Sequence, residues 1–361
     1  MDIYLRRNSK FTSMRAIMIV VCLILTLSSC SKRNQCLSSF ELKAPEGYSI
    51  QQLSSFDGVG DLEYVQFVSN VVGFILVHKD SIATELLKTT DGGRSWESLG
   101  VILDNHYAKD PFFWDGQTGI VPVYKNPPYP SLLKTEDGGQ SWEEIILPGL
   151  VGALSDLCTD GMGNIYGRTS GFDVPNHIIK STDRGASWEK LYTLPSWQGR
   201  ILEVENERIY VEQPGHELLV LDLEGNEVGR IQMDHITNLI DDFKVVDHNN
   251  IIATDTRNAI KTSDGGQNWA LFFEGEVKLI DFTSPDEGLM VLQKGFCEDD
   301  ILASYSISHT VDGGHSWTES NWVYGLDPWS TTLATLSTSR YVLLVKNGPD
   351  RYDMYELKAE G

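Results

Sequence analysis

The most constraining feature of this 361-residue chain is an eight-residue segment that occurs five times. Its shared pattern is Ser or Thr, any residue, Asp, any residue, Gly, any residue, Ser or Asn, and Trp. Asp can turn a chain by accepting hydrogen bonds from backbone N–H groups two residues on, Gly tolerates positive φ, and hydroxyls bond locally. We therefore predict five hairpin turns, which we call box turns, each with a Trp ring buried against the next sheet. They occupy residues 89–96, 135–142, 181–188, 262–269 and 310–317.

Three positions of each box turn have roles that follow from their residue types. The Asp is expected to hold the turn by hydrogen bonds, the Gly two positions later to supply positive φ, and the Trp to pack. We predict that these residues serve folding and contact no ligand. They are Asp91, Gly93, Trp96, Asp137, Gly139, Trp142, Asp183, Gly185, Trp188, Asp264, Gly266, Trp269, Asp312, Gly314 and Trp317.

The spacing of the box turns indicates what they build. Successive box Trp residues lie about 46–48 positions apart, except for one gap of about 81 positions between Trp188 and Trp269. The long gap fits two units, and near its middle two alternating apolar runs flank a Glu-Gly-Asn turn within 219–228. We interpret 219–228 as a copy that has lost the box. Units of roughly 40–50 residues rich in strand and turn signals are typical of β-propellers, with one four-stranded blade per unit.

The C-terminal part of the chain supplies strands for a last blade. Strand-like runs at 333–336, 341–346 and 352–357 give three strands, and Tyr48–Leu53 can supply the fourth by pairing the two chain ends. Such pairing leaves no long free edge. The sequence therefore predicts an all-β fold, a single β-propeller of four-stranded antiparallel blades over residues 45–361. Seven blades are favoured, and six are the alternative.

At the box residues the sequence resembles the Asp-box, or BNR, repeat of sialidases, of the Vps10/sortilin family and of the YCF48-like photosystem II assembly factors. The resemblance covers five places in the chain and implies a propeller of that superfamily. It implies little about activity, because in those families the box is a structural hairpin away from the ligand face. The photosystem factors also use an Arg-rich face, and Arg is sparse here.

Residues 1–29 have the composition of a bacterial export signal. Lys and Arg residues precede an apolar run, Ala16–Leu27, that is too short to cross a bilayer, which needs about 20 residues. The run leads into Leu-Ser-Ser-Cys, which resembles the lipobox of lipoproteins, where the chain is cut before a Cys that carries diacylglycerol. We predict lipidation at Cys30, a tether over residues 30–44 and attachment to a lipid membrane through the acyl chains. An ordinary secretory signal is the alternative.

The residues of the tether also indicate on which side of the envelope the protein lies. Some surface-exported lipoproteins carry acidic residues just behind the lipidated Cys, whereas the residues behind Cys30 are basic. We therefore expect a membrane-anchored lipoprotein of the bacterial cell envelope that faces the periplasm, with surface display as the alternative.

Charge and cysteine content exclude several classes of function. A formal net charge of −22 argues against a nucleic-acid partner, because the phosphate backbone and the protein would repel each other. Cys158 is expected to be buried, while Cys36 and Cys297 could pair or stay free. The metal-binding spacings C-x-x-C and H-E-x-x-H are absent from the sequence. We expect no metal and no other cofactor.

The motifs do not support sialidase activity. Sialidases hold the substrate carboxylate with three Arg residues, one of them in an Arg-Ile-Pro motif ahead of the first box, and no Arg-Ile-Pro occurs here. Xyloglucanase-like glycosidases carry Asp-boxes too, but they use two propellers in tandem. A non-catalytic binding or scaffold protein is therefore predicted, with no catalytic residue. The alternative is a glycoside hydrolase whose two carboxylates face each other across the funnel.

Ligand contacts are expected on the face opposite the box turns. If a box turn joins the third and fourth strands, the second-to-third turns and the crossings between blades open on the other face. Three loops there, 124–130, 168–175 and 294–300, carry aromatic or cationic residues suited to a protein partner or a glycan. The alternative is that these aromatic rings plug the funnel rim or pack on neighbouring blades. The candidate contacts are Tyr124, Lys125, Tyr129, Arg168, Phe172 and Phe296.

Overall fold

Every regular element in the described part of the chain is a β-strand. The predicted export signal, Cys30, Cys36 and Cys297 lie outside the described residues, as do Lys125 and Phe172. None of the described segments forms a helix long and apolar enough to cross a membrane. The computed structural model describes residues 44–79, 83–104, 106–108, 111–124, 129–171, 175–194, 200–236, 240–255, 257–282, 284, 286–296, 303–320, 323–325, 332–337, 340–348 and 351–360.

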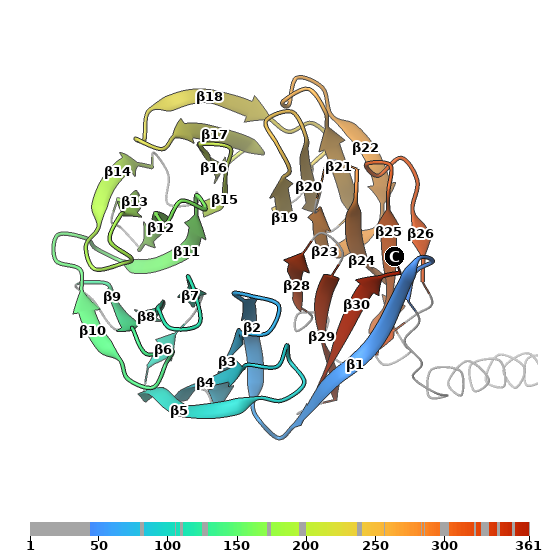
Figure 1. Cartoon of the computed structure of the whole chain (residues 1–361). Coiled ribbons are helices and arrows are strands. Elements are labelled where there is room, and N and C mark those ends of the chain that lie inside the picture. Colours follow the sequence, from blue (N-terminus) through green and yellow to red (C-terminus); the bar gives the residue numbers. More distant parts are fainter. Residues whose placement is uncertain are drawn as a thin grey trace, which may run out of the picture.

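The strands form seven antiparallel sheets arranged in a ring, each with its first strand innermost (Figure 1). The predicted seven-bladed propeller is thereby confirmed. Blade 1 contains β2 (Asp61–Phe67), β3 (Gly73–Lys79), β4 (Ala83–Thr89) and β5 (Glu97–Asp104). Blade 2 contains β6 (Tyr107–Ala108), β7 (Phe112–Phe113), β8 (Gly119–Tyr124), β9 (Ser131–Thr135) and β10 (Glu143–Ile146). Blade 3 contains β11 (Ala153–Thr159), β12 (Ile165–Ser170), β13 (His177–Ser181) and β14 (Glu189–Thr193).

Blades 4 to 6 continue the same order around the ring. Blade 4 contains β15 (Arg200–Glu205), β16 (Arg208–Gln213), β17 (Glu217–Asp222) and β18 (Glu227–Gln232). Blade 5 contains β19 (Ile240–Val245), β20 (Ile251–Asp255), β21 (Asn258–Thr262) and β22 (Ala270–Glu274). Blade 6 contains β23 (Glu276–Phe282), β24 (Gly288–Phe296), β25 (Ala303–Thr310), β26 (Thr318–Glu319) and β27 (Val323–Gly325).

Blade 7 joins the two ends of the described chain. It consists of β28 (Thr332–Ser337), β29 (Arg340–Gly348), β30 (Arg351–Ala359) and, as its outermost strand, β1 (Tyr48–Asp57). Tyr48 pairs with Ala359 at one end of the β1–β30 ladder, and Asp57 pairs with Arg351 at the other. The predicted closure of the ring by the N-terminal strand is confirmed. Between each pair of neighbouring blades lies one apolar cluster of described residues.

The first box turn shows how the repeated residues shape the chain. Asp91 Oδ1 accepts hydrogen bonds from Arg94 N (3.0 Å) and Ser95 N (2.9 Å), and Asp91 Oδ2 accepts one from the Ser95 hydroxyl (2.6 Å). Thr89 Oγ1 donates to Asp91 Oδ1 (2.8 Å) and accepts from Gly93 N (3.0 Å). The bonded N–H groups are thus three and four residues after the Asp, not two as expected. Two consecutive Gly residues with positive φ make the loop wider than a single β-turn.

Each box turn lies beside the turn between the first and second strands of its own blade. In blade 1, Gly92 N donates to Val71 O at 2.9 Å, and in blade 2, Gly138 N donates to Gln117 O at 2.7 Å. The box turns and the first-to-second turns therefore share one face of the ring, which we call the box face. The second-to-third turns and the crossings between blades lie on the other face, which we call the opposite face.

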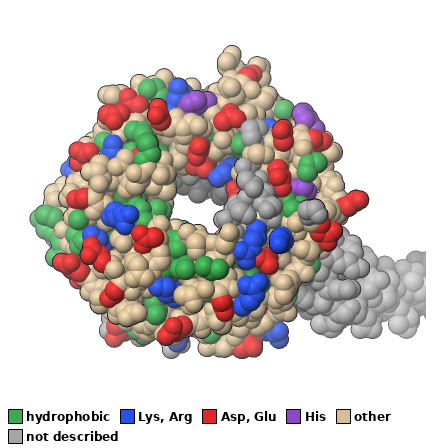
Figure 2. All heavy atoms as spheres, viewed as in Figure 1, with side chains coloured by type: hydrophobic (Ala, Val, Ile, Leu, Met, Phe, Trp, Pro, Cys, Tyr) green, Lys and Arg blue, Asp and Glu red, His purple; other side chains and the backbone are tan. Residues whose placement is uncertain are grey.

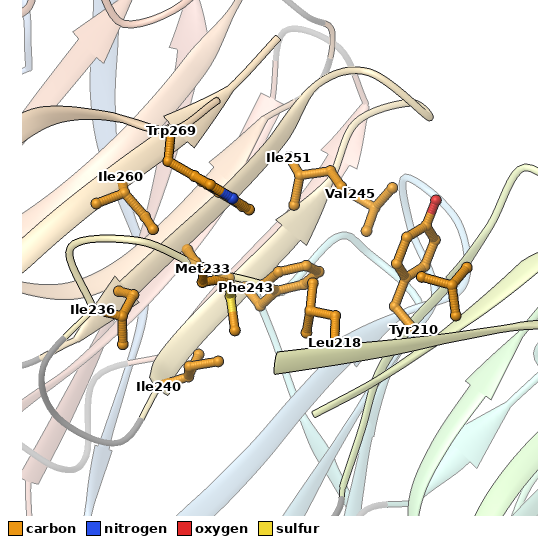
Figure 3. Close-up of a cluster of buried hydrophobic side chains, with 12 residues drawn as sticks. Tyr210, Leu218, Met233, Ile236, Ile240, Phe243, Val245, Ile251, Ile260 and Trp269 are labelled. Carbon is orange, nitrogen blue, oxygen red and sulfur yellow. The ribbon is translucent and has the colours of Figure 1, made fainter. Parts of the chain in front are cut away.

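The box Trp rings pack against the preceding blade, not against the next one as expected. Trp269 of blade 5 is 8% exposed and lies in a cluster with Tyr210 and Leu218 of blade 4 (Figure 3). Its indole N–H donates to the backbone oxygen of Gln232, the last residue of β18, at 2.9 Å. The other four box Trp rings pack on the preceding blade in the same way. On this side Trp269 has both apolar neighbours and an acceptor for its indole N–H, which favours this direction.

The second Gly of a box turn is required by its surroundings as well as by its φ. Gly139 has a φ of +95°, and a Cβ there would lie 2.8 Å from side-chain atoms of Leu86 and Leu99 in blade 1. At Gly266 a Cβ would lie 2.2 Å from Ile231 Cγ2 of blade 4. At these two box turns the backbone therefore lies directly against side chains of the preceding blade.

Blade 4 has no box sequence but keeps part of the same hydrogen bonding. Asp222 Oδ1 accepts from Asn226 N at 2.7 Å, and Asp222 Oδ2 accepts from Asn226 Nδ2 at 2.9 Å. These contacts match those between Asp91 and Ser95 in blade 1. Since the described cluster between blades 3 and 4 contains no Trp, blade 4 has kept the turn without the ring that packs on its neighbour.

Candidate functional site

The first strands of the blades surround an opening at the centre of the ring (Figure 2). On the face shown in Figure 2, Asp and Glu side chains are spread around the ring, while Lys and Arg side chains gather beside the opening on the side of blade 7. A register shift interrupts the pairing of strands β2, β11, β15, β19, β23 and β28 with their neighbours. Such bulges re-aim the side chains that follow them.

Three charged side chains form a row across the first strands of blades 4, 5 and 6. Lys244 on β19 lies between Glu203 on β15, with Nζ–Oε1 at 2.9 Å, and Asp281 on β23, with Nζ–Oδ1 at 3.5 Å. The Glu203 carboxylate also accepts a hydrogen bond from the backbone N–H of Val245. We call these three side chains the charged row. All three are mostly buried.

Burial is the main influence on the titration of the charged row. Burial raises the pKa of Glu203, although Lys244 and the Val245 N–H act in the other direction, and it raises the pKa of Asp281 against the pull of Lys244. Burial lowers the pKa of Lys244, but the two carboxylates outweigh it and the pKa is raised overall. Lys244 is therefore charged at neutral pH, and the two carboxyl groups take up protons more readily than they would in water.

The charged row lacks the arrangement of a hydrolytic pair. Because both carboxylates contact Lys244 Nζ, their nearest oxygens are at most about 6.4 Å apart, which by distance alone suits a glycosidase. The ammonium group, however, lies between them, where a glycosidic oxygen or a water would have to enter. A similar link joins blades 1 and 2, where Gln66 bonds Phe113 N (2.8 Å) and Phe113 O (3.1 Å). The row therefore holds adjacent first strands together.

Arg168, a predicted contact residue, lies within strand β12 and not in a loop as expected. Its Nε donates to Asp156 Oδ2 at 2.6 Å, and its side chain is mostly buried. Asp156 lies at the bulge of β11 and has a φ of 55°. The segment is a strand because β12 pairs with β11 on one side and with β13 on the other. Arg168 thus links two strands of blade 3.

The other described contact candidates lie at the opposite face, on different blades. Tyr124 ends β8 and is half-buried, while Tyr129 lies just before β9 and is 49% exposed. Phe296 is the last residue of β24 in blade 6, not part of a loop as expected. The structure brings Tyr124 and Tyr129 to one turn of blade 2, and Phe296 is separated from them by blades 7 and 1.

The charged row was not among the predicted sites. The sequence pattern that could have indicated it is a polar residue directly before a Phe or Val near the end of the first strand. This pattern becomes visible only when the sequences of the blades are aligned with one another. The pattern occurs at Gln66-Phe67, Glu203-Val204, Lys244-Val245 and Asp281-Phe282.

Metal and thiol chemistry have little support in the described residues. No group of three or more His, Cys, Asp and Glu side chains among them is placed to hold a metal ion. Cys158 is a free thiol on β11, with its Sγ 4.0 Å from Tyr166 O. Burial raises the pKa of the Cys158 thiol, and nearby carboxylates add to the shift. Cys158 is therefore protonated at neutral pH and a poor nucleophile.

No family model and no curated protein matches the sequence, whereas solved structures match the fold. The structure described as YCF48 bound to D1 peptide has a TM-score of 0.56 and 17% identity, over 88% of this chain and 97% of that one. The GH74 xyloglucanase from Xanthomonas campestris has a TM-score of 0.55 and 12% identity, over 83% of this chain. The match spans only 53% of the xyloglucanase chain. The chain is a propeller similar in fold to both.

Proposed function

We propose that this protein is a lipid-anchored, non-catalytic Asp-box β-propeller that binds a peptide segment of a protein partner in a bacterial cell envelope. The observation that carries the proposal is the extent of the fold match. The chain covers 97% of a propeller solved with a bound peptide but 53% of the xyloglucanase. The charged row supports it, since both of its carboxylates are paired with Lys244.

Peptide contacts are assigned to the opposite face. Tyr124 and Tyr129 are the main candidates, because they share one turn and Tyr129 exposes about half of its surface. Exposed Tyr rings on a rigid scaffold bury much apolar area at low cost in side-chain entropy. Lys125, Phe172 and Phe296 remain further candidates for the same surface.

A double substitution tests this assignment. Tyr124→Ala with Tyr129→Ala should abolish capture of the native partner in a membrane pull-down and leave the melting temperature nearly unchanged. The control is Met162→Ala with Val311→Ala, which removes two exposed apolar side chains from the box face. Capture that survives the Tyr pair, or that is lost equally in the control, would reject the assignment.

The lipid anchor is tested separately. Cys30→Ala should leave an uncleaved or soluble precursor that takes up no labelled palmitate. A single acyl chain binds membranes only weakly, so stable anchoring requires more than one chain on the modified Cys. Unchanged palmitate labelling in the variant would rule out Cys30. Protease protection in intact cells then separates a periplasm-facing protein, as we propose, from one displayed at the surface.

A glycoside hydrolase is the second candidate, favoured by the fold likeness to the xyloglucanase and by the short Glu203–Asp281 separation. We expect the purified protein to release no reducing sugar from xyloglucan. We also expect no turnover of a fluorogenic sialoside, because no Arg-Ile-Pro occurs and an acidic protein repels the sialic acid carboxylate. Hydrolysis that disappears in Asp281→Asn would replace the binding proposal with an enzymatic one.

A further inference from the structure

A nearly buried cation lies at the boundary between blades 7 and 1, towards the opposite face. Lys346 is close to the end of β29, its side chain is 11% exposed, and its Nζ donates to Asp61 Oδ1 at 3.0 Å. The same oxygen accepts a hydrogen bond from the Tyr352 hydroxyl at 3.3 Å. Lys346 Nζ also lies 5.4 Å from the centre of the Tyr352 ring, which helps to hold the ammonium in place. Two donors from different strands thus converge on one carboxylate oxygen.

The Asp61 carboxylate is far more exposed than the Lys346 and Tyr352 side chains that donate to it. The Asp61 side chain is 68% exposed, whereas Tyr352 is fully buried. Asp61 is the first residue of β2, directly after the crossing from β1, so its side chain can turn into solvent without moving the sheet. Lys346 and Tyr352 belong to the two middle strands of blade 7. They are paired with each other, and Tyr352 is also paired with Phe56 of β1.

Two more cations border the crossing that leads to Asp61. Arg351 is half-exposed and its Nε lies 3.8 Å from Asp57 Oδ1. A Cβ on Gly60 would lie 3.4 Å from the side chain of Lys79. Both already have carboxylate partners, because Arg351 also lies 3.5 Å from Asp353 Oδ1 and Lys79 pairs with Glu85. Among the described residues, the donors of the subsite are therefore Lys346 and Tyr352 alone. Burial alone lowers the pKa of Lys346, but Asp61 and Tyr352 outweigh it and raise the pKa, so the ammonium is charged at neutral pH.

We propose that Lys346 and Tyr352 form a carboxylate-binding subsite in which Asp61 acts as an internal ligand, displaced when a carboxylate of the partner peptide binds. The identity of the ligand as a peptide rests on the proposed function. The subsite itself rests on the convergence of the two donors. Because an ion pair with a mostly exposed carboxylate adds little stability, exchanging Asp61 for another carboxylate costs little. The competing role for Asp61 is that of a link between blades 7 and 1 that no ligand replaces.

Acetate is the probe that separates these two roles without any peptide. Asp61→Ala removes the internal ligand, and acetate binding to it is followed by NMR of protein with 13C-labelled Lys, at constant ionic strength, with acetamide as the uncharged control. We expect Asp61→Ala to bind acetate at least tenfold more tightly than the wild type. Adding Lys346→Met to Asp61→Ala should abolish this binding, and adding Tyr352→Phe should weaken it. Equal acetate affinity in Asp61→Ala and Asp61→Ala/Lys346→Met would overturn the proposal, as would equal binding of acetamide.

A second measurement on Asp61→Ala identifies the source of the carboxylate. N-acetyl-dialanine with a free C-terminus is compared with its amide, with an amidated N-acetyl-alanyl-glutamate, and with glucuronate. Preference for the free C-terminus assigns the subsite to a chain end, and preference for the Glu peptide assigns it to an acidic side chain. Binding of glucuronate alone would overturn the peptide part and leave the carboxylate subsite in place. If Asp61→Ala binds no acetate but the wild type still captures its partner in the pull-down, the subsite is refuted and the proposed function is not.

Discussion

The carboxylates of the box turns and those of the charged row titrate in opposite directions. Asp91 and Asp137 accept hydrogen bonds from a Ser hydroxyl and from backbone N–H groups, and these bonds lower the pKa of each to about 2. Glu203 and Asp281 are enclosed between blades, and burial raises their pKa values. The pKa values of the box carboxylates therefore depend on donors within five residues of sequence. Those of Glu203 and Asp281 depend on contacts with other blades.

The two regions also differ in how they join the blades. A box turn contacts the preceding blade through its Trp ring. A Lys side chain of that preceding blade can also donate hydrogen bonds to the backbone beside the box turn. Lys88 of blade 1, for example, donates to Gly116 O (2.8 Å) and Gly138 O (3.3 Å) of blade 2. The charged row joins blades 4, 5 and 6 only, through side chains outside the box turns. Repeated local structure makes the ring, and single long-range contacts add to it.

The largest effect is expected on the box side, from loss of a Trp ring. Trp269→Ala should lower the free energy of unfolding by about 3–5 kcal/mol, because it leaves a cavity between blades 4 and 5 that the neighbouring side chains cannot fill. Urea denaturation measures the change. Trp269→Phe is the matched control and should lose less, since it keeps an aromatic ring but not the hydrogen bond to Gln232 O. Equal stability of Trp269→Ala and the wild type would show that the ring is not a structural contact.

A somewhat smaller loss is expected from the charged row. Lys244→Met should cost about 3 kcal/mol, because it leaves Glu203 and Asp281 buried without their cation. Lys190→Met, an exposed Lys on β14, is the control and should change the free energy of unfolding little. If the two variants are equally stable, the row contributes nothing to the blade contacts.

The pH dependence of Lys244→Met should identify the row as the cause of that loss. The folded pKa values of Glu203 and Asp281 lie above their unfolded values, so ionisation of these groups costs stability at neutral pH, and the cost falls as the pH drops through the folded pKa values. Removing Lys244 raises those pKa values further. The melting-temperature difference between Lys244→Met and the wild type should therefore shrink on acidification from pH 7 to 5. A difference that grows over this range would contradict the assigned shifts.

The smallest effect is expected from a single box carboxylate, and it should disappear at a lower pH than the effect of Lys244→Met. Asp137 has a pKa of about 2 against an ordinary value of 3.8, so its contribution to stability is complete above pH 4 and is lost as the pH falls towards 2. Asp137→Ala should therefore lower the melting temperature by a few degrees at pH 7 and progressively less below pH 4. Asp222→Ala in boxless blade 4 is the comparison, and its pKa is lowered for the same kind of reason. A pH-independent difference for Asp137→Ala would mean that the turn does not depend on the ionised carboxylate.

The repeating parts of this protein could be predicted from its residues. Box turns, blade length and the pairing of Tyr48–Leu53 with the C-terminal strands could all be predicted, because the residues that shape each turn lie within eight positions and recur. Even the lost copy at 219–228 was placed correctly, since Asp222 and Asn226 keep the spacing that forms the turn. Local hydrogen bonding and periodicity depend on residues that are close in sequence, so they can be predicted from it.

The contacts between blades could not be predicted, because they form only in the folded ring. Each box Trp packs on the preceding blade, and strand pairing on both sides places Arg168 in β12 beside Asp156. The charged row joins residues from three blades, and Lys346 meets Asp61 across more than half of the chain length. Such contacts depend on the ring closing, which sets the distance between first strands, and no pattern of neighbouring residues encodes that distance.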